Sequence, residues 1–367
     1  MKSLLSTLFV VFLLVLFGCQ QELKVYRIGA VIPLSGQFEA YGRNVKNGLT
    51  LALEEINAAG GVKGKPLDIL FEDDRSDEKV GANKAQSLVK NTAVPIIIGG
   101  VTSNVALAMA PVCEKGKVVL LSPTASSPKL SGIGQYFFRN YPSDTLEGRV
   151  MAEYAVRRMK IRTVAILYID KEYGKGITDV FKERFQNLGG VVTYEKGYPE
   201  GTVDFVDDVK QVRANPPDAV YLPGYFTEVA AVLKELKSQK VEAKVISTQG
   251  MAEPMIVEIA GDAAEGVVYP QPPFDPESKA PEIQKFVAAY KKKFPTKPNV
   301  DVAFSYDALR LVAKAIENCA NYPADLRARI ADTNFKGLTG DIAFGSDGDA
   351  NIEPQMFVVR GGQFVPI

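Results

Sequence analysis

Short apolar runs alternate with segments of helical period along most of this chain, and this alternation limits its possible folds more than any other feature. In the first third, strands are expected at 25–33, 67–71, 95–98 and 118–121. Helical spacing of apolar residues predicts helices between them, at 43–59, 78–91 and 103–115. Strands that are separated by helices pair in parallel, so the pattern predicts an α/β fold with both faces of its sheet covered.

The same order restarts near Ser143. Helices are expected at 147–159, 176–188, 205–214 and 227–239, and strands at 163–168, 191–194, 219–222 and 245–247. A proline-rich stretch at 270–276 is interpreted as a crossing segment. Two helices, at 281–294 and 302–319, precede a tail that is rich in strand signals from Asp341, with strands at 355–360 and 363–365. The chain, at 367 residues, is long enough for two domains of ordinary size.

A weak internal repeat supports two similarly wound halves. Tyr41-Gly42 leads into a helix that stops at Gly60-Gly61, and Tyr173-Gly174 leads into one that stops at Gly189-Gly190. Matching halves would place both tyrosines at the carboxyl edge of a sheet, where open α/β folds bind ligands. The alternative is that tyrosine-glycine before a helix is common and carries no function.

The first nineteen residues read as an export signal. Lys2 precedes an apolar run at 4–17, and Gly18 stands directly before Cys19. The run is shorter than the roughly 20 residues of a membrane span. We expect residues 1–18 to be a lipoprotein signal peptide and Cys19 to carry a lipid anchor, with the body exported to the periplasm or the cell surface. An ordinary signal peptide or an uncleaved anchor is the alternative.

Composition excludes several classes of function. The chain has no histidine, so serine-histidine and cysteine-histidine nucleophile systems are impossible, and so are histidine-based metal sites. Lysine plus arginine and aspartate plus glutamate both total 43, which leaves no strong basic field for nucleic acid. Besides Cys19 there are only Cys113 and Cys319, too few for a metal cage. Whether they form a disulfide stays open. We expect no metal and no cofactor.

Two loops that follow predicted strands could hold an anion. The first is Gly99-Gly100-Val101-Thr102-Ser103-Asn104, which ends in a helix start, where free N–H groups and the helix dipole favour negative charge. Thr102 or Ser103 could instead simply cap that helix. The second is a rigid loop at 122–128 that contains Thr124, Ala125 and Ser126. A plain surface loop is its alternative.

A resemblance to a known family covers nearly the whole chain after the signal. The matching segments occur in order: Ile28-Gly29-Ala30-Val31-Ile32-Pro33-Leu34-Ser35-Gly36, Asn57-Ala58-Ala59-Gly60-Gly61-Val62-Lys63-Gly64, Leu121-Ser122-Pro123, Ala260-Gly261-Asp262-Ala263-Ala264-Glu265-Gly266, Ser305-Tyr306-Asp307-Ala308 and Gly340-Asp341-Ile342-Ala343-Phe344. The chain thereby resembles the leucine/isoleucine/valine-binding proteins, the type I solute-binding proteins of ABC importers.

The resemblance implies two Rossmann-like lobes joined by three crossover segments, with a ligand between them. Lobe 1 would comprise 25–140 and 271–344, and lobe 2 would comprise 141–270 and 345–367. It places a ligand carboxylate at Ser103 and the 124–126 loop. It places Tyr41, Tyr173 and Tyr225 on the walls of the cleft. The implied partners are a small amino acid or related carboxylate and an ABC permease in the inner membrane.

One position departs from the family pattern. Members that take branched-chain amino acids hold the ligand ammonium with a glutamate, where Gln249 stands here. An amide cannot neutralise a cation, and an unpaired buried ammonium would cost several kcal/mol. Either Asp301 supplies the missing carboxylate, or the ligand has no free ammonium. An exposed helix cap just before Val302 is the alternative role of Asp301.

The sequence thus favours a lipid-anchored receptor that captures a solute for an ABC importer and catalyses nothing. A ligand-sensing receptor of the same fold, for an amide or an aromatic acid and coupled to signalling, is the competing hypothesis. Neighbouring permease and ATPase genes would favour the importer, and a kinase or receptor gene the sensor. An enzyme is disfavoured because neither a P-loop nor a dinucleotide-binding glycine motif follows a strand.

The signal predicts a testable N-terminus. Mass spectrometry of the membrane fraction should find a mature chain that begins at a lipid-modified Cys19, because the small residue and cysteine follow the apolar run directly. Cys19→Ser should release the protein from that fraction. An unmodified chain that begins elsewhere would refute the prediction.

Overall fold

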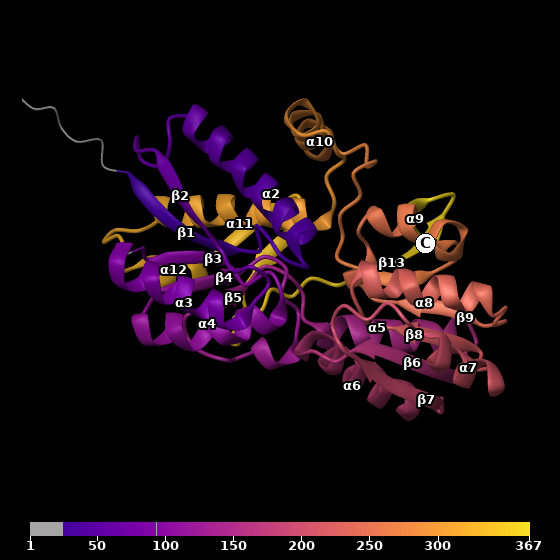
Figure 1. The fold of residues 1–367 in the computed structure, drawn as a ribbon. Coiled ribbons are helices and arrows are strands. Elements are labelled where there is room, and N and C mark those ends of the chain that lie inside the picture. Colours follow the sequence, from indigo (N-terminus) through magenta and orange to yellow (C-terminus); the bar gives the residue numbers. More distant parts are fainter. Residues whose placement is uncertain (1–24, 93) are drawn as a thin grey trace, which may run out of the picture.

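The computed structural model describes residues 25–92 and 94–367, and it contains two α/β lobes that lie side by side (Figure 1). We call them the first lobe, built on a five-stranded sheet, and the second lobe, built on a seven-stranded sheet. Cys19 and the predicted signal lie outside the described residues. Within the described part of the chain, no helix combines the length and apolar character that a membrane crossing requires.

The sheet of the first lobe is parallel throughout. In spatial order its strands are β2 (Leu67–Asp73), β1 (Tyr26–Ile32), β3 (Ile96–Gly99), β4 (Val119–Ser122) and β5 (Phe137–Arg139). Strands β3, β4 and β5 are buried along their whole length, as expected for a sheet that helices cover on both faces.

Helices cover this sheet in two groups. Helix α2 packs closely against α11 on one side, and α3 packs against α4 on the other. The helical segments of this lobe are α2 (Glu39–Ala58), α3 (Glu78–Ser87), η1 (Leu88–Thr92), α4 (Ser103–Gly116), η2 (Pro128–Leu130), α10 (Pro281–Lys293), α11 (Val300–Glu317) and α12 (Leu326–Ala331). A small antiparallel ladder joins β11 (Asn334–Gly337) to β12 (Gly340–Ala343).

The sheet of the second lobe is mixed. Its strands, in spatial order, are β14 (Gln363–Pro366), β13 (Gln355–Arg360), β10 (Val268–Gln271), β9 (Lys244–Ser247), β8 (Ala219–Leu222), β6 (Thr163–Ile169) and β7 (Val191–Tyr198). The C-terminal strands β13 and β14 are antiparallel, and the other pairs are parallel. Its helical segments are α5 (Asp144–Arg157), α6 (Glu172–Asn187), α7 (Val206–Ala214), α8 (Phe226–Ser238), η3 (Gln249–Met251), α9 (Met255–Ala260) and η4 (Gly261–Ala264).

Three segments connect the lobes. They run from β5 to α5, from β10 to α10 and from β12 to β13. The predicted fold class, two doubly wound lobes joined by crossovers, is confirmed. The proline-rich stretch expected to cross from Pro270 begins later, because Pro270 still belongs to β10, opposite Met356 of β13.

The two tyrosine-glycine motifs occupy equivalent places. Each lies in the first turn of its helix, α2 or α6, rather than before it. A Cβ atom on Gly42 would lie 1.8 Å from the carbonyl oxygen of Pro33, and one on Gly174 would lie 2.2 Å from that of Ile169. Glycine therefore lets each helix start close against the end of the preceding strand, and the neighbouring tyrosine is fixed at that edge.

A disulfide between Cys113 and Cys319 is not formed, because both residues are free and buried. Cys113 packs in the apolar layer between α4 and its sheet, whereas the thiol of Cys319 donates to the carbonyl of Ala315 at 3.3 Å after the end of α11. The sequence could not show this, because the separation depends on which face of the sheet each helix covers.

A buried ion pair joins two of the crossing segments. Arg139, at the end of β5, is fully buried, and its Nε donates to Asp349 Oδ1 at 2.6 Å. A second guanidinium nitrogen donates to Asp349 Oδ2 at 2.7 Å, so the contact is bidentate. The crossing from β12 to β13 is thus held directly beside the crossing from β5 to α5.

This pair yields a stability prediction. Asp349→Ala should lower the free energy of unfolding by about 3–5 kcal/mol, because it leaves the buried guanidinium without its carboxylate. Denaturant unfolding measures the change. Asp332→Ala removes an exposed carboxylate 3.8 Å from Arg329 and serves as the control, with an expected loss below about 1 kcal/mol. Equal losses in the two variants would contradict the prediction.

Candidate ligand-binding site

A cavity lies between the two lobes. It contains about 380 Å³ of empty space, part of it open to solvent. Its lining comprises Tyr41, Val101, Thr102, Ser103, Thr124, Ser126, Tyr173, Tyr225, Gln249, Gly250 and Asp301. All the candidate residues named from the sequence meet here except Ala125, which is buried beside the cavity.

The start of α4 forms one wall. Gly99 and Gly100 have φ angles of 152° and 66°, in the range that favours glycine, and they bring the chain from β3 into the helix. Thr102 is the N-cap residue, but its side chain makes no capping hydrogen bond. Ser103 Oγ accepts from the backbone N–H of Ser126 at 3.3 Å and of Ser127 at 3.1 Å. Ser103 therefore does not cap its own helix, and its hydroxyl proton remains available to a ligand.

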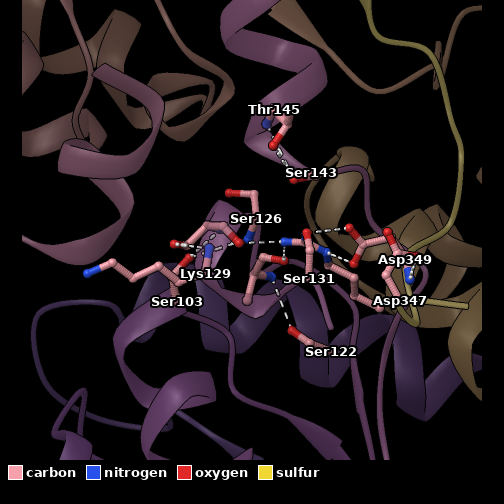
Figure 2. A network of polar contacts seen from close by, with 12 residues as sticks. Ser103, Ser122, Ser126, Lys129, Ser131, Ser143, Thr145, Asp347 and Asp349 are labelled. Carbon is pink, nitrogen blue, oxygen red and sulfur yellow. Dashed lines mark hydrogen bonds and ion pairs between the residues drawn. The ribbon is translucent and has the colours of Figure 1, made fainter. Parts of the chain in front are cut away.

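Further hydrogen bonds fix the neighbouring loop. Thr124 Oγ1 donates to the carbonyl of Val101 at 2.8 Å. Ser122 Oγ donates to Gly100 O at 3.0 Å and accepts from Ala125 N at 3.1 Å. Ala125 thus contributes backbone contacts rather than surface. A network of polar contacts extends from Ser103 and Ser126 to Ser131 and Asp349 (Figure 2), so the crossing ion pair also positions this loop.

Three tyrosines form the aromatic part of the lining. The ring centroid of Tyr225 lies 5.5 Å from that of Tyr41 and 5.3 Å from that of Tyr173. Tyr41, on α2 of the first lobe, donates through its hydroxyl to Gly250 O of the second lobe at 2.7 Å. Tyr173 donates to Thr248 Oγ1 at 2.7 Å. Burial raises the pKa of all three phenols, so they are neutral hydrogen-bonding groups.

Asp301 supplies the carboxylate of the lining. Helix α11 begins at Val300 with Asn299 as its N-cap, and only 3% of Asp301 is exposed. An exposed cap is therefore the wrong reading of this residue. Burial, together with the nearby charge of Glu253, raises the pKa of Asp301 to about 7. Hydrogen bonding by the side chains of Gln249 and Asn44 acts in the opposite direction.

Sequence reasoning missed Glu253 and Asn44. Glu253 follows η3 in the second lobe, and its Oε2 accepts from Asn44 Nδ2 of α2 at 2.9 Å and from Asn299 Nδ2 at 3.2 Å. Burial raises the pKa of Glu253 to about 7. No local motif signals these residues, because they contact each other across the two lobes and are 209 positions apart in the sequence.

The backbone of Gln249 is also held by a buried acid. Its N–H donates to Oε1 of Glu147 at 2.9 Å, below the cavity wall. Burial, with the neighbouring Asp144, raises the pKa of Glu147 well above its ordinary range. Across residues 25–92 and 94–367, no group of three or more acidic or cysteine side chains is placed to hold a metal ion. The cavity is thus a polar and aromatic site without an evident place for a metal.

Comparison with known proteins identifies the family. The family model described as "periplasmic binding protein" matches residues 25–363. The chain belongs to the periplasmic binding protein family. The resemblance seen in the sequence is thereby confirmed.

Relatives match this periplasmic binding protein over most of their length. The leucine-, isoleucine-, valine-, threonine- and alanine-binding protein of Pseudomonas aeruginosa is 28% identical over 88% of this chain and 86% of its own. Leu/Ile/Val-binding protein homolog 3 of Brucella melitensis is 30% identical over 87% of this chain and 85% of its own. The crystal structure of a leucine-binding protein from Thermotoga maritima superposes with a TM-score of 0.88 at 28% identity. The match covers 93% of this chain and 97% of the Thermotoga chain.

Proposed function

We propose that this protein is the solute-binding lipoprotein of an ABC importer. It captures a small, amino-acid-like molecule that bears a carboxylate, between two lobes that close like a hinge, and it presents that molecule to a permease in the inner membrane. Cys19 anchors it on the outer side of that membrane or at the cell surface. The observation that carries the proposal is the cavity between the lobes, with the free hydroxyl proton of Ser103 at the start of a helix.

The carboxylate would bind at the start of α4. This helix has 14 residues, and its first backbone N–H groups have no partner within the helix. The positive end of the helix dipole favours an anion there. Ser103, whose oxygen already accepts two backbone hydrogen bonds, would donate its proton to the carboxylate. No lysine or arginine of the described part of the chain lines the cavity, so neutral donors would bind the carboxylate.

Polar contacts between the lobes support a closing motion. Besides Tyr41 and Glu253, Gln37 Nε2 of the first lobe donates to Glu228 Oε1 of the second at 2.6 Å. Contacts of this kind can exchange with water when the lobes separate, whereas a large apolar interface would not. A ligand that touches Ser103 on one lobe and Tyr225 on the other would add to these contacts and stabilise the closed form.

The relatives support the class of solute. They are named for binding leucine, isoleucine, valine, threonine and alanine, all of which carry a carboxylate and an ammonium. A thermal-shift screen over amino acids, amides and aromatic acids would find the solute of this protein, since a ligand at one hundred times its Kd adds about 2.7 kcal/mol of stability.

Ser103→Ala should weaken binding of the solute found in that screen by about 10- to 100-fold, as measured by calorimetry. The lost interaction is a hydrogen bond to a charged group, worth about 1.5–3 kcal/mol. Asp77→Ala is the matched control, because Asp77 truly caps its helix by accepting from Val80 N at 2.9 Å. It should lose about 1 kcal/mol of stability and no affinity. If Ser103→Ala behaves like this control, Ser103 has only a structural role.

A further inference from the structure

Two buried carboxyl groups lie at the cavity or next to it. Asp301 lines the cavity, and Glu253 lies close behind it at 7% exposure. The amide of Asn44 donates to Glu253 Oε2 at 2.9 Å, and its side chain is also near enough to Asp301 to oppose the rise of that pKa. We call Asp301 and Glu253 the acid pair.

Among the described residues, no buried base neutralises the acid pair. The groups that face Asp301 are Glu253 and the neutral phenols of Tyr41 and Tyr141. Glu253 is faced by Tyr41 and, more remotely, by Arg43, whose side chain is 56% exposed and pairs with Glu39 instead. Two like charges that are buried this deeply resist ionising together near neutral pH unless a counter-ion is present.

The aromatic lining indicates what the counter-ion is. Tyr41, Tyr173 and Tyr225 line the same small cavity as Asp301. Aromatic rings attract organic cations, which gain most where water is excluded. A protonated ammonium or guanidinium would therefore find a carboxylate and aromatic rings together, whereas an aliphatic side chain would leave the acid pair without a counter-charge.

We propose that the ligand of this protein carries an organic cation, an ammonium or guanidinium, which binds at the acid pair and displaces the proton that the pair holds when the cavity is empty. This rests on the proposed function, in which the ligand carboxylate binds at Ser103. The step is an ion exchange: one carboxyl group releases its proton to solvent, and the resulting carboxylate pairs with the cation. No covalent bond to carbon or nitrogen changes.

The direction of the pH effect follows from this exchange. Burial raises the pKa values of both members of the acid pair to about 7, and the charge of Glu253 adds to the effect on Asp301. Below about pH 7 the cation must displace a proton, so its affinity falls by up to about tenfold per pH unit as the solution becomes more acidic. Above about pH 8 the pair is ionised already, and the affinity should level off.

Two pairs of nearly isosteric probes test the proposal on the mature protein: guanidinoacetate against ureidoacetate, and γ-aminobutyrate against γ-hydroxybutyrate. The members of each pair share the carboxylate and differ in the positive charge. Calorimetry should give a Kd at least about tenfold lower for the cationic member of one or both pairs. Runs in phosphate and in Tris near pH 7 should show net proton release. Equal or tighter binding of the neutral members, no binding of either cation, or proton uptake would overturn it.

Asp301→Asn should remove both the preference for the cationic member and the pH dependence of its Kd, which a purely structural role would not do. Glu228→Gln is the matched control, because Glu228 is also a buried carboxyl group that accepts from the other lobe but does not line the cavity. It should keep the ratio of the two Kd values. A ratio that survives in Asp301→Asn would contradict the proposal.

The two proposals fail in different ways. If a neutral or purely anionic solute binds in a manner that depends on Ser103, the proposed function stands and the cation site is wrong. If no solute of any class stabilises the protein, the proposed function itself fails.

Discussion

The buried ion pair of Arg139 and Asp349 holds the rest of the molecule in register. Arg139 is fully buried and uses its whole guanidinium: the bidentate contact to Asp349, a bond to Ser131 Oγ at 2.8 Å and one to Ser127 O at 2.9 Å. An uncompensated charge at this depth would cost several kcal/mol, so these partners must assemble together. The pair thereby fixes two crossings between the lobes and the loop that presents Ser126 to the cavity.

Charge is distributed unevenly around the cavity as a consequence. Arg139, the one buried arginine among the described residues, is already paired with Asp349, and Ser103 and backbone N–H groups remain as donors near Ser126. Asp301, which also lines the cavity, and the neighbouring Glu253 have no buried base beside them in the part of the chain that the structure describes. Neutral donors and a buried acid in one cavity are complementary to a molecule that carries both a carboxylate and a positive group.

Closing of the lobes is also coupled to protonation of the acid pair. In an open, hydrated cleft the carboxyl groups of the acid pair return toward their ordinary pKa, near 4. Closing without a cation raises that pKa to about 7, so the empty closed form takes up a proton near neutral pH and is penalised as the pH rises through that range. A cationic ligand removes this penalty. The same two residues can therefore connect specificity with closing.

The sequence by itself determined the fold class, because helical and strand periodicity depend on near neighbours and strands separated by helices pair in parallel. Together with the family resemblance it also brought forward ten lining candidates, of which only Ala125 is absent from the cavity surface. Motifs that adjoin strand ends, such as Ser103 and the loop after β4, are readable because the carboxyl edge of a parallel sheet is where such residues converge.

Only the tertiary structure decided what depends on contacts between distant segments. It placed Asp301 as a buried residue of the cavity lining rather than at an exposed helix cap, and it brought Glu253 against Asn44 across the two lobes. It also left Cys113 and Cys319 as free thiols in separate apolar layers. Burial, charge balance and the distance between two side chains are properties of the packed molecule, and residue order alone carries none of them.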